Sequence, residues 1–195
     1  MSYETEQIDA LLKVYDAAKP ETFDELIRFS VHRLEALAHR HLNGEVFIRR
    51  WEETGDVLQN ATVRLYRALQ EVRPANKKEF FLLAATMIRR EIIDMARKYR
   101  SEYSDAAHHH TAAAAETGNS FRYWEGKIDA SPEQLLMFHE AVEQLEPDDR
   151  ALFELRFYQG MDLNQAAETL GISERTARRR WRSARLTMER YYQVE

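Results

Sequence analysis

The 195-residue chain contains no cysteine, only 6 glycines and only 4 prolines. The lack of cysteine excludes disulfides, thiolate zinc sites, iron–sulfur clusters and a cysteine nucleophile, and it fits a reducing compartment. Because glycine and proline make tight turns, their scarcity favours long helices and disfavours an all-β fold. No run approaches the roughly 18 apolar residues of a membrane span, and residues 1–6 lack the basic region of a secretory signal. We therefore expect a cytoplasmic protein.

The net charge of −5 is unevenly distributed along the chain. Residues 71–100 hold eight Lys and Arg against four Asp and Glu, and residues 173–195 hold seven against three. Residues 131–172 hold two against nine. Two short basic segments on an acidic background predict that a polyanion would meet two local patches rather than the whole surface. Two solvated helix faces are the alternative that charge alone leaves open.

The apolar residues follow helical spacing over most of the chain, with no strong strand signal. In the first half we expect helices near residues 8–15, 22–42, 56–72 and 76–99, which would form a compact four-helix bundle. Residues 101–130 lose this periodicity and are rich in Ser, Ala, His, Thr and Gly, which predicts a flexible linker. Helical spacing resumes at residue 131. We therefore predict an all-α fold of two small helical domains, residues 1–100 and 131–195.

Residues 163–182, LNQAAETLGISERTARRRWR, have the order of a helix-turn-helix. Asp162 and Gln165 have the spacing of a pair that caps a first helix. Gly171 then allows positive φ in the turn, and Ser173 can cap a second helix. Such a bent pair of helices is typical of DNA-binding proteins, whose second helix enters the major groove.

The second helix of this pair would be basic on one side. Ala177 and Trp181, one helical turn apart, can form its inner face. The outer face then carries Arg175, Arg178, Arg179 and Arg182. Arginine pairs bidentately with guanine edges and phosphates, so these four residues are the expected DNA contacts. A plain helical hairpin with a solvated basic face is the alternative.

A second basic patch lies on the helix expected near residues 76–99. Aromatic and apolar residues are interleaved with its charges, an arrangement that suits a nucleic-acid strand with unstacked bases. Lysines and arginines that only solubilise a bundle helix would look the same. We interpret Asp94 as a partner of other side chains in this helix rather than as a catalytic acid. The basic residues assigned to the patch are Arg89, Arg90, Arg97 and Lys98.

Taken in order, these segments resemble a bacterial sigma-70 family factor of the extracytoplasmic function (ECF) group. GDVLQNATVRLYRAL is similar to that family's core-polymerase-binding helix, with Asp56, Gln59 and Tyr66 at its acidic, glutamine and aromatic positions. FFLLAATMIRREIIDMARKYR is similar to the helix that recognises and melts the −10 promoter element. The helix-turn-helix resembles the region that binds the −35 element. The chain has Arg90 and Thr62 where the family often has Asn and Phe.

The resemblance implies a protein that binds rather than catalyses. Residues 1–100 would be similar to sigma region 2, docking on the clamp helices of core RNA polymerase and holding the melted −10 element with Arg89, Arg90, Arg97 and Lys98. Residues 131–195 would be similar to region 4, docking on the polymerase flap and reading −35 duplex with the four helix-turn-helix arginines. The linker would let both units reach promoter DNA at once. The resemblance also implies a monomer when free and an anti-sigma factor as a partner.

Three other functional classes are alternatives: a stand-alone helix-turn-helix regulator, an enzyme, and a protein-only adaptor, which would leave both basic patches unused. A stand-alone helix-turn-helix repressor or activator would bind a palindromic duplex as a dimer, without polymerase. An enzyme would need a catalytic set, and the sequence lacks the GxxxxGK[ST], HExxH and GxSxG motifs. Three adjacent histidines, His108–His110, cannot all face one ion without strain, so we expect a solvated loop there, with no metal site and no cofactor.

Overall fold

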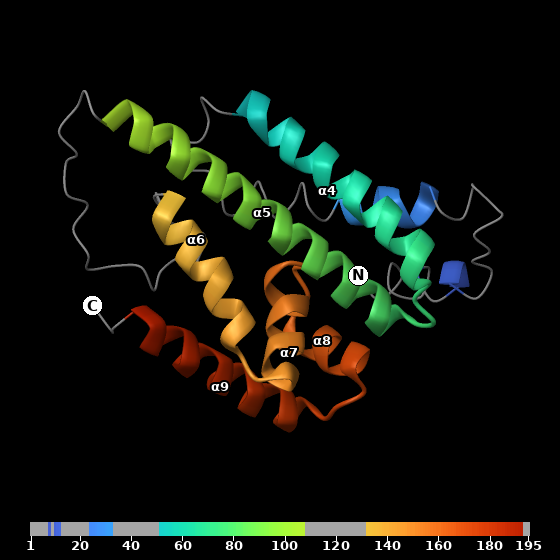
Figure 1. Ribbon diagram of the computed structural model, residues 1–195. Helices are drawn as coiled ribbons and strands as arrows, with labels where there is room; N and C mark the ends of the chain where they lie inside the picture. Colours follow the sequence, from blue (N-terminus) through green and yellow to red (C-terminus); the bar gives the residue numbers. More distant parts are fainter. Residues whose placement is uncertain (1–7, 9, 13–23, 33–50, 108–131, 193–195) are drawn as a thin grey trace.

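The computed structural model describes residues 8, 10–12, 24–32, 51–107 and 132–192. Within these ranges every regular element is a helix, which confirms the all-α prediction (Figure 1). None of these helices is long and apolar enough to cross a membrane. The elements with assigned bounds are α4 (Trp51–Val72), α5 (Lys77–Ala107), α6 (Pro132–Ala141), the 3-10 turn η2 (Val142–Gln144), α7 (Pro147–Phe157), α8 (Leu163–Leu170) and α9 (Glu174–Tyr192).

Helix α4 begins at Trp51, earlier than the start predicted near residue 56. The helix includes Gly55, although a glycine within a helix costs about 1 kcal/mol relative to alanine. The helix ends as predicted before Pro74, where Arg73 adopts a left-handed φ of 46°.

Helix α5 is longer than predicted. Asn76 caps its start: the Asn76 Oδ1 accepts from the Glu79 backbone N–H at 3.0 Å, and the Glu79 carboxylate accepts from the Ala75 N–H at 2.9 Å. The sequence predicted an end near Tyr99, but the helix continues to Ala107. Residues 100–107 contain no glycine or proline and end in two alanines, so nothing breaks the helix. The first part of the predicted linker is therefore helix, and residues 108–131 lie outside the described part.

Helix α5 lies between α4 and the C-terminal unit, which we define as residues 132–192 with helices α6 to α9 (Figure 1). On one side, Leu65 and Leu69 of α4 pack in a buried cluster with Phe80 and Phe81 of α5. The same cluster includes residues of the C-terminal unit, among them Leu152, Leu155, Ala166, Ala167 and Ala177. The two predicted domains therefore share a hydrophobic core, a point that the sequence analysis left open.

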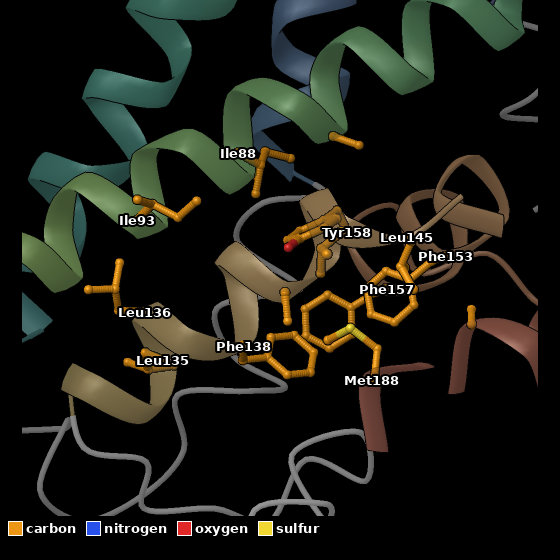
Figure 2. Close-up of a cluster of buried hydrophobic side chains, with 14 of the residues drawn as sticks. Ile88, Ile93, Leu135, Leu136, Phe138, Leu145, Phe153, Phe157, Tyr158 and Met188 are labelled. Atoms are coloured by element: carbon orange, nitrogen blue, oxygen red, sulfur yellow. The ribbon is translucent and has the colours of Figure 1, made fainter. Parts of the chain in front are cut away.

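A second buried cluster joins the middle of α5 to α6, α7 and α9. Figure 2 shows Ile88 and Ile93 of α5 facing a group of side chains from the C-terminal unit that includes Leu136 and Tyr158. Within it, the Tyr158 hydroxyl lies 2.7 Å from Nδ1 of His139, and both residues are fully buried. This hydrogen bond satisfies two polar groups that burial would otherwise penalise.

Candidate nucleic-acid interface

Helices α8 and α9 form the predicted helix-turn-helix. The Asp162 carboxylate accepts from the Gln165 N–H and the Gln165 side chain accepts from the Asp162 N–H, both at 2.9 Å, which completes a capping box. Gly171 adopts φ 65°, and its N–H donates to the Glu168 carbonyl at 3.1 Å. Ser173 Oγ accepts from the Thr176 N–H at 3.2 Å, so it caps α9 as predicted. The turn follows from these local hydrogen bonds.

The inner face of α9 is fixed against α7 and α8. Ala177 is fully buried. The Trp181 ring stacks on Phe153, with 5.9 Å between ring centroids, and the Arg156 guanidinium lies 3.9 Å above the Trp181 ring. Burial lowers the pKa of Arg156, although Asp162 acts to raise it. The Trp181 ring gives the guanidinium a favourable cation–π contact. The inner-face prediction is confirmed, so the opposite face of α9 has a defined orientation.

That opposite face is a row of exposed arginines. Arg175, Arg178, Arg179 and Arg182 are all exposed. Arg178 forms an ion pair with Glu174 one turn earlier, which holds it along the helix surface. Arg180, which was not among the predicted contacts, behaves differently: its side chain is only 19% exposed and pairs with Asp148 of α7. The structure thus separates four outward arginines from one that joins two helices.

The four basic residues predicted on α5 fall into three environments. Arg90 and Lys98 are exposed. Arg97 is exposed on one side, and its guanidinium donates to the Glu140 carboxylate of α6 at 2.8 Å. Arg89 is buried, with only 3% of its side chain exposed. All four residues were predicted to contact DNA, whereas in this structure the Arg89 side chain is buried away from solvent.

Arg89 lies among acidic side chains of the C-terminal unit. Its guanidinium pairs with Glu143 of η2, and its Nε lies 3.4 Å from the Glu154 carboxylate of α7. Arg150 also reaches Glu143, at 3.1 Å. Sequence reasoning did not identify Glu143 and Glu154 as partners, because they lie far from Arg89 along the chain and no local pattern links them.

Burial and pairing shift the pKa values of this group in opposite directions. Desolvation raises the pKa of Glu154 to about 7, although Arg89 and Arg150 both act to lower it. The hydrogen bond from Arg89 lowers the pKa of the more exposed Glu143. For Arg89, burial acts to lower the pKa, but Glu143 and the other nearby groups reverse this and raise it. Glu143 is therefore the firmly ionised partner of Arg89, and Glu154 titrates near neutral pH.

On α4, two of the three predicted polymerase contacts share one face. Gln59 and Tyr66, seven residues apart, are both exposed, Tyr66 to 44%. Val63 lies between them and is 43% exposed, which sequence reasoning missed although its helical spacing places it on the same face. The side chain of Asp56 lies outside the described part of the structure. Gln59, Val63 and Tyr66 form what we call the α4 face.

The side of α4 near α5 is held by ion pairs. Arg64 lies 2.8 Å from the Glu91 carboxylate and 2.6 Å from the Asp94 carboxylate, both on α5. The sequence predicted partners for Asp94 within its own helix, whereas Arg64 belongs to α4. Asp94 therefore joins α4 to α5.

No group of three or more His, Asp and Glu side chains that could hold a metal ion occurs among the described residues. His108–His110 lie outside them. The arrangement instead offers exposed arginines on α9, basic residues on α5 and a mixed apolar and polar face on α4. Surfaces of this composition are typical of proteins that bind nucleic acid or other proteins.

Comparisons with known proteins agree with this arrangement. A family model described as ECF sigma factor matches residues 5–194, almost the whole chain. Searches of curated proteins and of solved structures found no match.

Proposed function

This chain belongs to the ECF sigma factor family, whose members bind RNA polymerase and direct promoter-specific initiation of transcription, and we propose that it divides promoter recognition between α9 and α5. In this proposal α9 reads −35 duplex and α5 holds the melted −10 element. Core RNA polymerase is the main protein partner. The match of the family model over residues 5–194 is the observation that carries the proposal.

The exposed row of arginines supports the role of α9. Arg175, Arg178, Arg179 and Arg182 all point away from the core, while Trp181 and Ala177 hold the opposite side. Because the backbone of this helix is already ordered, it can present its guanidinium groups to a major groove with little loss of conformational entropy on binding. Those groups would supply both base contacts and phosphate contacts.

The basic side chains of α5 support its role at the −10 element. Arg90, Arg97 and Lys98 are exposed and lie on the helix that resembles the family's −10-binding helix. A flipped base costs a few kcal/mol of unstacking, which contacts to polymerase and to the −35 element offset. In this structure the C-terminal unit buries Arg89. Arg89 can therefore contact DNA only in an arrangement in which the C-terminal unit has moved away from α5.

The α4 face supports docking on the polymerase clamp helices. It combines an amide, an aromatic ring and an apolar side chain, Gln59, Tyr66 and Val63, on one exposed side. Aromatic residues with polar tips are enriched in protein interfaces. The C-terminal unit would dock on the flap, and an anti-sigma factor would compete for either surface.

Co-elution with core RNA polymerase in gel filtration tests this function. We expect the wild-type protein to co-elute and the Gln59→Ala/Tyr66→Ala variant to bind core about tenfold or more weakly, since truncating an interface aromatic costs about 2 kcal/mol. The control variant is Glu71→Ala/Val72→Ala, which changes two exposed residues elsewhere on α4. A wild-type protein that stays separate from active cognate core and forms a dimer on palindromic duplex would favour the repressor alternative instead.

A further inference from the structure

One of the four outward arginines of α9 has an acidic neighbour. The Nη2 of Arg178 donates a hydrogen bond to the Glu174 carboxylate, and both side chains are exposed, Arg178 to 70% and Glu174 to 48%. The other three arginines form no ion pair with any described side chain: Arg175, Arg179 and Arg182. The row therefore contains one arginine with a carboxylate beside it and three without.

The turn of the helix-turn-helix sets the position of Glu174. Glu174 is the first residue of α9 and follows Ser173, whose Oγ accepts from the Thr176 N–H at 3.2 Å. Residues four apart on a helix lie one turn apart on the same face. Because this cap fixes the backbone at the start of α9, the Glu174 carboxylate is held beside the Arg178 guanidinium.

The ion pair leaves most of the Arg178 guanidinium free to bind. The contact with Glu174 uses one donor on Nη2, and the remaining donors still include an adjacent pair. Such a fork matches the N7 and O6 acceptors of guanine. An unpaired arginine loses side-chain entropy when it binds a base, whereas Arg178 has lost part of that entropy already. Pairing therefore prepares Arg178 for a bidentate contact.

The carboxylate also determines which kind of DNA group suits Arg178. A backbone phosphate is an anion, so Glu174 would repel it and compete with it for the same guanidinium. The edge of a guanine carries no net charge, so the carboxylate opposes it much less. A helix N-terminus otherwise attracts phosphate, and Glu174 in the first turn of α9 counteracts that attraction. Arg178 is therefore suited to a base rather than to the backbone.

The location of Arg178 along α9 agrees with this role. It lies in the second turn, and the N-terminal part of a recognition helix is the part that contacts base edges. Arg182 lies one turn further along the helix. With no carboxylate paired to them, Arg175, Arg179 and Arg182 suit phosphate groups of any sequence as well as bases.

We propose that Glu174 is a positioning residue that directs Arg178 to a guanine of the −35 duplex and away from the DNA backbone. The inference rests on the proposed role of α9 and assigns base reading to one of its four arginines. Glu174 acts through Arg178 and makes no base contact of its own. Without Glu174, Arg178 binds phosphate as well, so the polymerase holoenzyme discriminates less between sequences.

Selection of duplexes by the polymerase holoenzyme tests this role. The pool carries a randomised upstream block, and the proteins compared are wild type, Glu174→Ala, Arg178→Ala and the double variant. The matched control is Glu189→Ala, which removes another acidic side chain of α9 that pairs with an arginine four residues away, Arg185, at 3.8 Å. Circular dichroism and thermal denaturation establish that each variant is folded at the temperature of the selection.

We expect the wild type to select a guanine at one position where Arg178→Ala selects none. Glu174→Ala should lower the preference for that guanine about fivefold, the effect of releasing one ordered long side chain. It should also steepen the salt dependence of binding by about one counterion, because Arg178 gains a phosphate contact. In the Arg178→Ala background the same substitution should leave the base preference unchanged. The Glu189→Ala control should match the wild type.

Each of four results would overturn the proposal. Wild-type base preference in Glu174→Ala would show that the carboxylate serves only the helix N-terminus. A loss of preference that persists in the Arg178→Ala background would show that Glu174 contacts a base itself. An equal loss in Glu189→Ala would trace the effect to net charge. An Arg178→Ala variant that selects the same guanines as the wild type would show that this arginine reads no base.

Failure of the proposed function gives a different result. A wild-type holoenzyme that selects no upstream block would show that α9 does not read −35 duplex, whatever the role of Glu174. Selection of an upstream block by all variants alike would leave the role of α9 intact and refute only the role of Glu174 and Arg178.

Discussion

Arg89 of α5 and Glu154 of α7 meet across the seam between the two halves of the chain, with 3.4 Å between Nε and Oε1 and both side chains no more than 6% exposed. Such a pair is costly to desolvate and adds little stability over an apolar contact. Removing either partner leaves the other charge buried without compensation, which lowers the free energy of unfolding. The pair therefore makes the packing of α5 against the C-terminal unit dependent on charge.

The stability of the protein should depend on the protonation of Glu154. Since its pKa is raised from 4.5 to about 7, the folded protein retains a proton that the unfolded chain releases in that interval. The contribution of Glu154 to the free energy of unfolding is therefore complete below pH 4.5, falls as pH rises and is lost above about pH 7. The whole change amounts to about 3 kcal/mol. Glu143, whose pKa is lowered, loses its contribution only on acidification below its ordinary range.

Urea denaturation of wild type and Glu154→Gln between about pH 5 and pH 8 measures this effect. The wild type should lose stability across the interval, and the variant should show a much flatter dependence because its amide does not titrate. Equal slopes for the two proteins would show that Glu154 is not the titrating group.

Removing the cation at the seam should destabilise the fold more than removing both charges. Arg89→Met leaves Glu154 without its cation on α5 and should reduce the free energy of unfolding by about 3 kcal/mol. The double variant Arg89→Met/Glu154→Gln should recover much of that loss, because no charge is then buried alone. A double-mutant cycle from denaturation curves gives the coupling between the two residues. A single variant as stable as the wild type would contradict a buried pair at this position.

Substitutions on α9 should separate DNA contacts from structural contacts. Replacing Arg175, Arg178, Arg179 or Arg182 by alanine should weaken binding of the polymerase holoenzyme to −35 duplex by about 1–3 kcal/mol wherever the residue reads a base. Substituting a residue that contacts phosphate should weaken binding to all duplexes equally and reduce the salt dependence of binding. Arg180→Ala is the matched control, because Asp148 holds this arginine away from the outer face. Equal losses for Arg180→Ala would refute the assignment of faces.

At Gly171, in the turn of the helix-turn-helix, a larger side chain should fit, but the positive φ should make most substitutions destabilising. Among the described residues, apart from its chain neighbours, no atom lies within 4 Å of the place where a Cβ would be, so Gly171→Ala adds no clash with them. Its φ of 65° still costs an alanine about 1–2 kcal/mol. Gly171→Asn should cost less, because asparagine adopts this conformation more readily. Thermal denaturation ranks the three proteins, and an alanine variant as stable as the asparagine variant would contradict this explanation.

The helix-turn-helix was predictable because its signals are local. The Asp162–Gln165 box, Gly171 and Ser173 act within a few residues, and the structure places each as the sequence indicated. On α5, by contrast, nothing in the sequence distinguishes Arg89 from Arg90. The difference arises from Glu143 and Glu154, which reach Arg89 only through the packing of the two halves. The partner of Asp94 on α4 was missed for the same reason.

Promoter selection from a pool of random duplex by core polymerase and this protein tests the central claim most directly. We predict that the recovered templates carry two separated sequence blocks, and that replacing all four outward arginines of α9 by alanine erases the upstream block while the downstream block remains. The Arg180→Ala holoenzyme should recover both blocks. Recovery of palindromic duplex by the protein alone, with no block selected in the presence of polymerase, would contradict a sigma factor that reads −35 with α9 and −10 with α5.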